Sequence, residues 1–350
     1  MIKIGIIGCG KIAQVRHIPE YAENPDAELA GYFSPNRSRA EEQAAKYGGK
    51  VFETADELLS DPEIEAVSIC AANNVHAQLT VKALAAGKNV LCEKPMATTL
   101  EDCEAMVKAA EKSGKFLMIG HNQRLAKAHV AAKRLIDSGE IGRIITFRTT
   151  FGHGGPETWS ISPGKNVWFF DKSKSALGAM ADLGVHKIDL MQYLTGQLVV
   201  RATARLITLD KCGASGEPIG VDDNAMCILE LSGGAAGTVT SSWTYYGEED
   251  NSTVLYGSKG IMHIYDDREH SIVIKYPDGN IRCMDVERIQ TNDNQTKSGI
   301  IDLWIDCLKT NTPPAISGES VLPAMRAVFA CVESSLTGRT VEIPENLRRA

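Results

Sequence analysis

Short apolar runs alternate with longer amphipathic stretches through the first third of the chain. The runs are rich in aliphatic and β-branched residues, as buried parallel strands are, and lie at 2–7, 29–33, 66–70, 89–92 and 116–119. The stretches at 11–23, 75–86 and 100–112 favour helices. Because strands that alternate with helices are joined by right-handed crossovers, this region predicts a doubly wound parallel sheet with helices on both faces.

The pattern changes after residue 122. A helix is expected at 126–137, then a longer alternating run at 143–151, and then a loop-like stretch in which a helix begins near Ala181. Glycine turns of the kind that close hairpins stand at 232–234 and 277–279. Further strands are expected at 199–208, 225–231, 236–244, 252–256, 260–265 and 271–276, and helices at 299–310 and 318–336. This part predicts an α+β domain with a large, mostly antiparallel open sheet.

The first apolar run ends in a glycine turn. Gly8-Cys9-Gly10-Lys11-Ile12-Ala13 reads G-x-G-x-x-A, a variant of the dinucleotide fingerprint. The first glycine permits a tight turn, the second lets the backbone approach a pyrophosphate, and the phosphates then lie on N–H groups at a helix N-terminus. Ordinary strand-to-helix turns also match such a short pattern. Its position directly after a strand favours a cofactor site at Gly8, Gly10, Lys11 and Ile12.

The residues after the second apolar run bear on the form of the cofactor. A fingerprint of this type usually has an acidic residue there, which binds the ribose 2′-hydroxyl. This chain has Ser34, followed by Arg37 and Arg39. A carboxylate would repel a 2′-phosphate, whereas hydroxyl and guanidinium groups donate hydrogen bonds to it. We therefore expect NADP or NAD, with NADP accepted; the alternative is that these are solvated residues at the start of a helix.

Composition and charge limit the partners. The 350 residues have a formal net charge of −7 with interspersed signs, which argues against nucleic acid and anionic membranes. No long apolar span or signal-peptide pattern is present, so a cytoplasmic location is expected. The nine cysteines include no C-x-x-C pair, so neither a disulfide framework nor a metal site is expected.

Three polar segments have residue types suited to cofactor binding and proton transfer: 71–76, 93–95 and 181–189. Lys94 precedes a proline that favours extended backbone, so its ammonium can hold an alkoxide at the ligand edge of the sheet. Asp182 and His186 are four residues apart and would share one face of a helix, where an imidazole suits removal of an alcohol proton. The ordinary alternatives are a surface lysine and an exposed i, i+4 pair.

Taken in order, the motifs resemble the Gfo/Idh/MocA family of nicotinamide-dependent oxidoreductases, which includes glucose-fructose oxidoreductase and inositol dehydrogenase. The order is G-x-G-x-x-A, N-x-x-H at 73–76, E-K-P at 93–95, N-x-R at 122–124 and D-x-x-x-H at 182–186. Segments 256–260 and 336–343 extend the resemblance over essentially the whole chain. It implies an α/β protein with a dinucleotide-binding Rossmann domain over 1–122 and a substrate-binding and oligomerisation domain over 123–350.

The resemblance also assigns roles to individual residues. Lys94 matches the lysine that contacts both cofactor and substrate, and His186 matches the usual acid/base, with Asp182 binding substrate or supporting it. Positions that line the cofactor in the family correspond to Asn73, His76 and Glu93. Near the substrate, Asn122 matches a family position, Trp168 resembles an aromatic that lies over the nicotinamide region, and His153 is a loop residue that is a candidate for specificity.

The residues and the resemblance together imply an NAD(P)-dependent oxidoreductase that transfers a hydride between the nicotinamide and a secondary alcohol of a sugar, sugar derivative or cyclitol. The expected partners are a small sugar or polyol substrate and further copies of the chain, as a homodimer or homotetramer. Two alternatives come from other classes: an NAD-dependent glycoside hydrolase that oxidises its substrate transiently, and a non-catalytic sugar- or nucleotide-sensing protein. The presence of Lys94, Asp182 and His186 together argues against the sensing protein, because sensing needs no proton acceptor.

Overall fold

The computed structural model describes residues 1–287 and 297–347. They divide into two compact units, of which the first comprises Met1–Asn122, Ser173–Ser175 and the described part of Asn294–Leu322. The second comprises Gln123–Lys172, Ala176–Asp293 and Pro323–Ala350, again as far as described. Helix α11 (Gly318–Thr337) crosses from one unit into the other. The roles expected of domains at 1–122 and 123–350 stay predictions.

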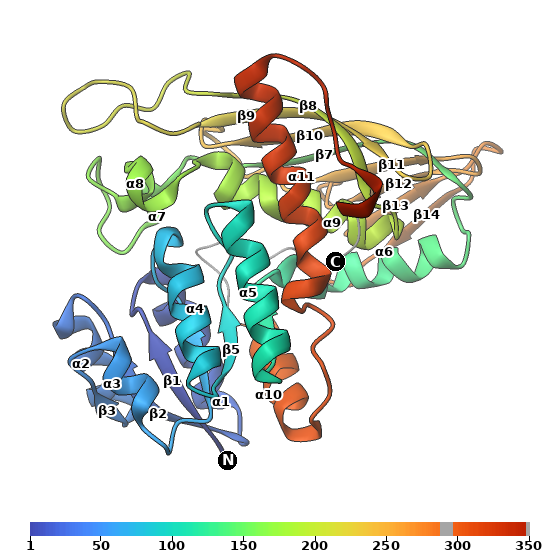
Figure 1. Cartoon of the computed structure of the whole chain (residues 1–350). Helices are drawn as coiled ribbons and strands as arrows, with labels where there is room; N and C mark the ends of the chain where they lie inside the picture. The colour runs from blue at the N-terminus through green and yellow to red at the C-terminus, as the bar shows by residue number, and fades with distance from the viewer. Residues whose placement is uncertain (288–296, 348–350) are drawn as a thin grey trace. The chain divides into compact units, whose positions relative to one another are not determined.

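A parallel sheet of order β3-β2-β1-β4-β5-β6 forms the centre of the first unit (Figure 1). The side chains of Ile4, Ile6 and Ile7 in β1 are buried, as expected of a strand covered on both faces. The strands are β1 (Ile2–Ile7), β2 (Ala27–Phe33), β3 (Lys50–Val51), β4 (Ala66–Ile69), β5 (Asn89–Cys92) and β6 (Leu117–Ile119).

Helices join these strands in both directions from β1. The crossover from β1 to β2 and the crossover from β4 to β5 advance in opposite directions along the sheet, so right-handed connections place their helices on opposite faces. Helix α10 comes from much later in the chain and packs on α1 and β1. The α-helices are α1 (Ile18–Glu23), α2 (Arg37–Tyr47), α3 (Ala55–Ser60), α4 (His76–Ala85), α5 (Leu100–Ser113) and α10 (Ile300–Thr310), with short helical turns η1 (Ala13–His17), η2 (Asn73–Val75) and, at the division between units, η3 (Asn122–Leu125).

The second unit contains a mostly antiparallel sheet of order β14-β13-β12-β11-β7-β10-β9-β8-β15. The hairpins expected at 232–234 and 277–279 join β9 to β10 and β13 to β14. β7 and β10 pair in parallel. The strands are β7 (Ile144–Gly152), β8 (Val199–Ile207), β9 (Asn224–Leu231), β10 (Ala236–Ser242), β11 (Thr253–Gly257), β12 (Ile261–Ile264), β13 (Ile272–Lys275), β14 (Ile281–Met284) and β15 (Val341–Glu342).

The two faces of this sheet differ. Helix α9 packs against β7 on one face, and residues of alternating positions such as Leu229 and Val239 are buried there. On the other face, Met226 and Ile228 are exposed between polar residues of neighbouring strands. The helices of the unit are α6 (Lys127–Asp137), α7 (Pro156–Trp159), α8 (Lys172–Ser175, shared with the first unit) and α9 (Val185–Thr195), with the short turns η4 (Trp168–Phe170), η5 (Met180–Gly184) and η6 (Glu345–Leu347).

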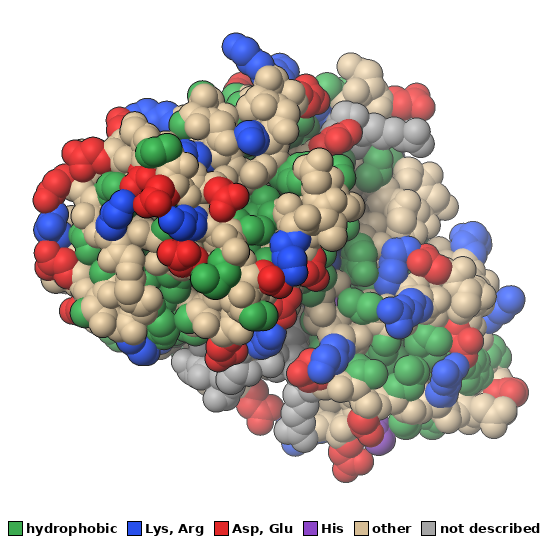
Figure 2. All heavy atoms as spheres, turned by 90° about the horizontal axis from the view of Figure 1, so that it is seen from below, with side chains coloured by type: hydrophobic (Ala, Val, Ile, Leu, Met, Phe, Trp, Pro, Cys, Tyr) green, Lys and Arg blue, Asp and Glu red, His purple; other side chains and the backbone are tan. Residues whose placement is uncertain are grey.

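Charges of both signs are intermixed on the molecular face that Figure 2 shows. Within the first unit, for example, Lys50 pairs with Asp61 and Glu63, and Lys82 pairs with Asp56. The interspersed signs noted in the sequence are therefore also interspersed in space on this face.

Candidate active site

The glycine turn after β1 has the two properties that the fingerprint requires. Gly8 has φ +95°, and a Cβ atom there would lie 2.8 Å from the Cys70 carbonyl and the Ala71 nitrogen. A Cβ atom on Gly10 would meet no atom nearer than the Cys70 oxygen at 3.9 Å. The first helical bond runs from Gln14 N to Gly10 O at 3.1 Å, so the preceding N–H groups lie at a helix N-terminus. These residues fit the pyrophosphate of a dinucleotide.

The arginines after β2 are in different situations. Arg37 is half exposed and pairs with Glu41, at 2.7 Å, and with Glu53. Arg39 is partly buried and close enough to the glycine turn to influence Cys9: burial raises the pKa of the Cys9 thiol to about 12, and the charge of Arg39 opposes this. The charge of Arg39 therefore acts on the glycine turn.

Glu93 is the centre of a buried polar network at the end of β5. Its Oε1 lies 2.9 Å from His17 Nε2 and 3.8 Å from Arg16 Nη1. Its Oε2 accepts the backbone N–H of Lys94 at 3.1 Å. Burial raises the pKa of the Glu93 carboxyl, but the hydrogen bond and charge of His17, with the charges of Arg16 and Lys94, outweigh burial and lower the pKa to about 2. The carboxylate thus holds the backbone of the predicted catalytic lysine.

The loops after β4 and β5 are tied together by His76. Its Nδ1 lies 2.8 Å from the Pro95 oxygen and its Nε2 lies 3.1 Å from the Ala71 oxygen. Burial lowers the pKa of His76, although both carbonyl contacts raise it. Asn73 donates to the Ser175 oxygen at 3.2 Å. The structure thus brings the loops that carry Gly8, Asn73 and Lys94 to one edge of the sheet, and the cofactor-binding roles of these residues stay predictions.

In the second unit, Asp182 and His186 do not lie on one regular α-helix as the sequence predicted. Asp182 belongs to the π-helical turn η5, and His186 is the second residue of α9, which follows directly. A π-helix has a wider turn, in which residues five apart, not four, are brought into register by the backbone hydrogen bonds. Both side chains are buried, at 7% and 6% exposure, which excludes an exposed i, i+4 pair.

Two charged side chains that follow His186 in the sequence anchor α9. Lys187 is fully buried and donates to the Asn251 oxygen at 2.9 Å. Arg124, from the N-x-R motif, makes a bidentate ion pair with Asp189, with Nε 2.8 Å from Oδ2. These contacts fix the helix that presents His186.

Asp182 lies in a cluster of aromatic and imidazole rings. Its Oδ2 accepts the indole N–H of Trp243 at 3.0 Å and lies 3.9 Å from His153 Nε2. The His153 ring meets Trp159 and Phe151 edge to face, each at 5.9 Å between centroids. The Phe151 ring is also 6.1 Å from the His186 ring. The structure thus brings together His153 and Asp182, which the sequence assigned to the substrate.

The sequence assigned two further residues to the substrate, and one of them, Trp168, extends this cluster through Phe169, whose ring lies 5.1 Å from the Trp159 ring and 6.4 Å from the Trp243 ring. Trp168 stacks on Phe169 at 3.9 Å between ring centroids, in the turn η4. Asn122 begins η3, after β6, with its backbone N–H bonded to the Gly120 oxygen at 2.9 Å. Their roles toward substrate stay predictions.

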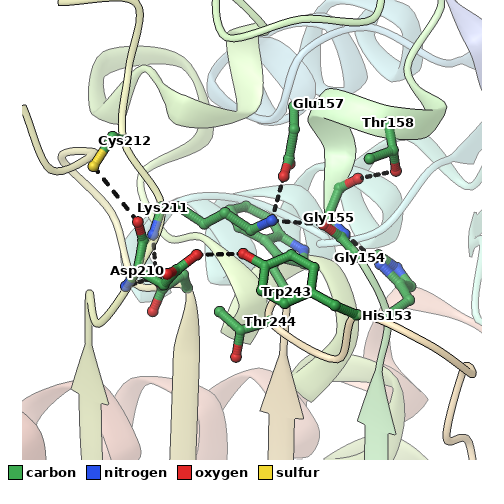
Figure 3. A network of polar contacts seen from close by, with 12 residues as sticks. His153, Gly154, Gly155, Glu157, Thr158, Asp210, Lys211, Cys212, Trp243 and Thr244 are labelled. Atoms are coloured by element: carbon green, nitrogen blue, oxygen red, sulfur yellow. Dashed lines mark hydrogen bonds and ion pairs between the residues drawn. The ribbon is translucent and has the colours of Figure 1, made fainter. Parts of the chain in front are cut away.

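Sequence reasoning missed Trp243, Asp222 and Lys211. Asp222 accepts the N–H groups of Gly178 and Met180, each at 2.8 Å, and so caps the turn that carries Asp182. Lys211 is joined to Gly154 and Glu157, near His153 (Figure 3). No spacing signal was available, because each partner comes from a distant part of the chain.

Residues 2–121 match the model of an oxidoreductase family with an NAD-binding Rossmann fold, and residues 129–263 match that of the GFO/IDH/MocA C-terminal domain. The two matches together cover most of the chain. The chain belongs to the Gfo/Idh/MocA family.

Individual relatives agree with this assignment. Myo-inositol 2-dehydrogenase of Thermotoga maritima is 26% identical over 347 residues, or 98% of this chain and 99% of the relative. Levoglucosan dehydrogenase of Pseudarthrobacter phenanthrenivorans is 31% identical over 297 residues, or 77% of this chain and 75% of the relative. A solved structure of levoglucosan dehydrogenase with NADH and levoglucosan has a TM-score of 0.86 at 25% identity, covering 98% of this chain and 99% of the other.

These findings confirm the predicted family, the fold class and the assignment of the chain as an oxidoreductase enzyme. In residues 1–287 and 297–347, no helix is long and apolar enough to cross a membrane. Nor do the described residues contain a group of three or more His, Cys, Asp or Glu side chains placed to hold a metal ion.

Proposed function

We propose that the protein is an NAD(P)-dependent dehydrogenase or reductase acting on a secondary alcohol of a sugar, sugar derivative or cyclitol. The observation that carries this proposal is the buried carboxylate of Asp182, which Trp243 orients at 3.0 Å immediately before the helix of His186. A buried carboxylate in the turn that leads into a helix with a buried imidazole suits the handling of a hydroxyl proton.

Each of these residues has its own role in the proposed reaction. His186 takes the proton of the substrate hydroxyl, Lys94 polarises the same oxygen, and Asp182 orients substrate and imidazole. Glu93 fixes the backbone of Lys94 by accepting its N–H at 3.1 Å. The glycine turn and the residues Lys11, Ile12, Asn73 and His76 hold the dinucleotide. When bound, the nicotinamide supplies the hydride acceptor or donor.

The substrate class rests on the relatives, which are named for myo-inositol and levoglucosan. His153 supports it, because a carboxylate and a ring N–H side by side offer an acceptor and a donor, and a hydroxyl group is both donor and acceptor. The relatives' names are those of dehydrogenases, so neither the hydrolase nor the sensing protein is favoured.

For the cofactor we propose that NADP is accepted beside NAD, through Ser34 and Arg39. Arg37 is already matched by Glu41 and Glu53, so it contributes little. Titration with NADPH and NADH tests this: Arg39→Ala should weaken NADPH binding more than NADH binding, and Arg37→Ala should change neither by more than about twofold. A large preference of the wild type for NADH would contradict it.

For the assembly we propose a homodimer or homotetramer that pairs through the open sheet face around Met226 and Ile228. Both are exposed, at 47% and 56%, on a face whose opposite side is covered by helices. Sedimentation of the wild type and of Ile228→Asp tests this, and a monomeric wild type would contradict it.

The reaction itself is tested with a panel of sugars, cyclitols and glycosides, each with NAD and NADP, followed by nicotinamide absorbance. The expected result is reduction of the nicotinamide by at least one polyol. Release of free sugar from a glycoside without net reduction would point to hydrolysis instead. No turnover with any member of the panel would contradict the proposal.

A further inference from the structure

Lys211 is a buried cation in the second unit, outside every motif of the sequence. It lies in the connection between β8 and β9 and is 5% exposed. The buried carboxylate of Asp223 shapes this connection by accepting the N–H groups of Leu209, Asp210 and Lys211 at 2.8, 2.7 and 2.8 Å. These hydrogen bonds therefore fix the backbone of Lys211 independently of its side-chain contacts.

The ammonium group of Lys211 is satisfied within the protein. It donates to the Gly154 oxygen at 2.6 Å, pairs with Glu157, and lies 4.5 Å from the centre of the Tyr246 ring (Figure 3). These contacts use two of the three N–H donors of the ammonium in hydrogen bonds and place an aromatic ring against its charge. Burial opposes the charge, but the contacts with Glu157 and Tyr246 raise the pKa of Lys211. Lys211 is thus a charged side chain that links the connection between β8 and β9 to Gly154 and Glu157, and it is unsuited to binding an anionic substrate.

The contacts of Lys211 are made with the turn that carries His153. This turn follows β7 and passes through Gly155, whose φ of +96° favours glycine. The Gly155 N–H donates to His153 Nδ1 at 3.1 Å, so the proton of the neutral ring lies on Nε2. Nε2 is the atom that lies 3.9 Å from Asp182 Oδ2. Lys211 holds the residues on both sides of Gly155, namely Gly154 and Glu157, in place.

We propose that Lys211, through its ion pair with Glu157, is a positioning residue that makes His153 present its Nε2–H beside the Asp182 carboxylate, where the two bind one substrate hydroxyl. The inference rests on the proposed function, because it assigns how that substrate is held. Removal of the Lys211 charge should weaken substrate binding more than it slows proton transfer, because the described contacts of Lys211 do not include Asp182 or His186.

The test compares Lys211→Met, which is close in length but uncharged, with Lys211→Arg. The matched control is Lys133→Met, which removes an ion pair with Asp137 within α6. Steady-state kinetics should show a KM for polyol about tenfold higher in Lys211→Met, as for one lost positioning interaction, with kcat within about threefold. Lys211→Arg should recover most of the affinity, and Lys133→Met should match the wild type.

A second readout does not depend on turnover. Ring-nitrogen NMR of His153 should show the Nε2–H tautomer in the wild type and a mixture of tautomers in Lys211→Met, with a His153→Gln variant to assign the signals. If Lys211→Met does not fold, Glu157→Gln removes the same ion pair and should give the same changes. Unchanged KM together with unchanged His153 signals would overturn the inference, whereas lack of turnover in the wild type would overturn the proposed function alone.

Discussion

Two buried carboxylates, Glu93 in the first unit and Asp182 in the second, are held in different ways. Glu93 lies beside the cation Arg16, at 3.8 Å, and the ring of His17, at 2.9 Å. Asp182 is oriented by the neutral indole N–H of Trp243 at 3.0 Å. Cations compensate the charge of a carboxylate, whereas a neutral donor orients it without cancelling its charge. This difference accords with the roles proposed for the two residues, in which Glu93 holds the loop of Lys94 and Asp182 binds substrate.

The largest expected effect is on catalysis. Lys94→Ala and His186→Ala should each lower kcat by roughly 10²–10⁴, because each removes a group that polarises or deprotonates the substrate hydroxyl. Single-turnover absorbance with saturating cofactor measures this, and the melting temperature of each variant is the control. Wild-type turnover in either variant would remove the role assigned to that residue.

The contrast between the carboxylates is tested directly by removing each charge. Glu93→Gln should lower the free energy of unfolding by about 3–5 kcal/mol, because it leaves the buried guanidinium of Arg16 uncompensated. Asp182→Asn keeps an oxygen for the Trp243 N–H and should cost no more than about 1 kcal/mol while activity falls. Urea unfolding followed by circular dichroism gives both values. Equal losses of stability would show that the two carboxylates are held alike.

The pH dependence of stability sharpens the comparison, because Glu93 and the buried cap Asp222 are shifted in opposite directions. The pKa of Glu93 is lowered from 4.5 to about 2, so its stabilising contribution is present above pH 4.5 and is lost as the pH falls toward 2.

Burial raises the pKa of Asp222 from 3.8 to about 7, so its contribution is present below pH 3.8 and is lost as the pH rises through 7. Relative to Asp222→Asn, the wild type should lose about 4 kcal/mol of stability between pH 4 and pH 7. Parallel pH profiles of the two proteins, measured by urea unfolding, would contradict this assignment.

The smallest expected effects are those of substitutions in the glycine turn, where we expect Gly8 to be required for stability and Gly10 for cofactor binding. Gly8→Ala places a Cβ atom 2.8 Å from the Cys70 carbonyl at φ +95°, and should lower stability by about 1–3 kcal/mol. Gly10→Ala meets no protein atom within 3.4 Å and should leave stability within about 0.5 kcal/mol. Calorimetry with NADH should nevertheless show at least about tenfold weaker binding for Gly10→Ala. Unchanged NADH affinity in that variant would argue against a pyrophosphate at this turn.

Much of the fold was predictable from local pattern. Strands such as β1 and helices such as α5 were identified close to their observed bounds, because apolar periodicity reflects which face of an element is buried. The predicted elements did not include α2, which is polar and buries few side chains such as Ala40 and Gln43, or β15, which has two residues. Weak amphipathicity and short length leave little periodic signal.

By itself the sequence determined the order of the elements, the glycine turn after β1, and the residue types for proton transfer at Lys94, Asp182 and His186, because these features are encoded in neighbouring positions. Only the tertiary structure decided that β7 and β10 pair in parallel, that Asp182 lies in a π-helical turn, and that Trp243 and Asp222 hold it. Such partners are tens of residues apart, and burial and hydrogen bonding select them when the chain packs. A local sequence pattern therefore cannot predict these partners.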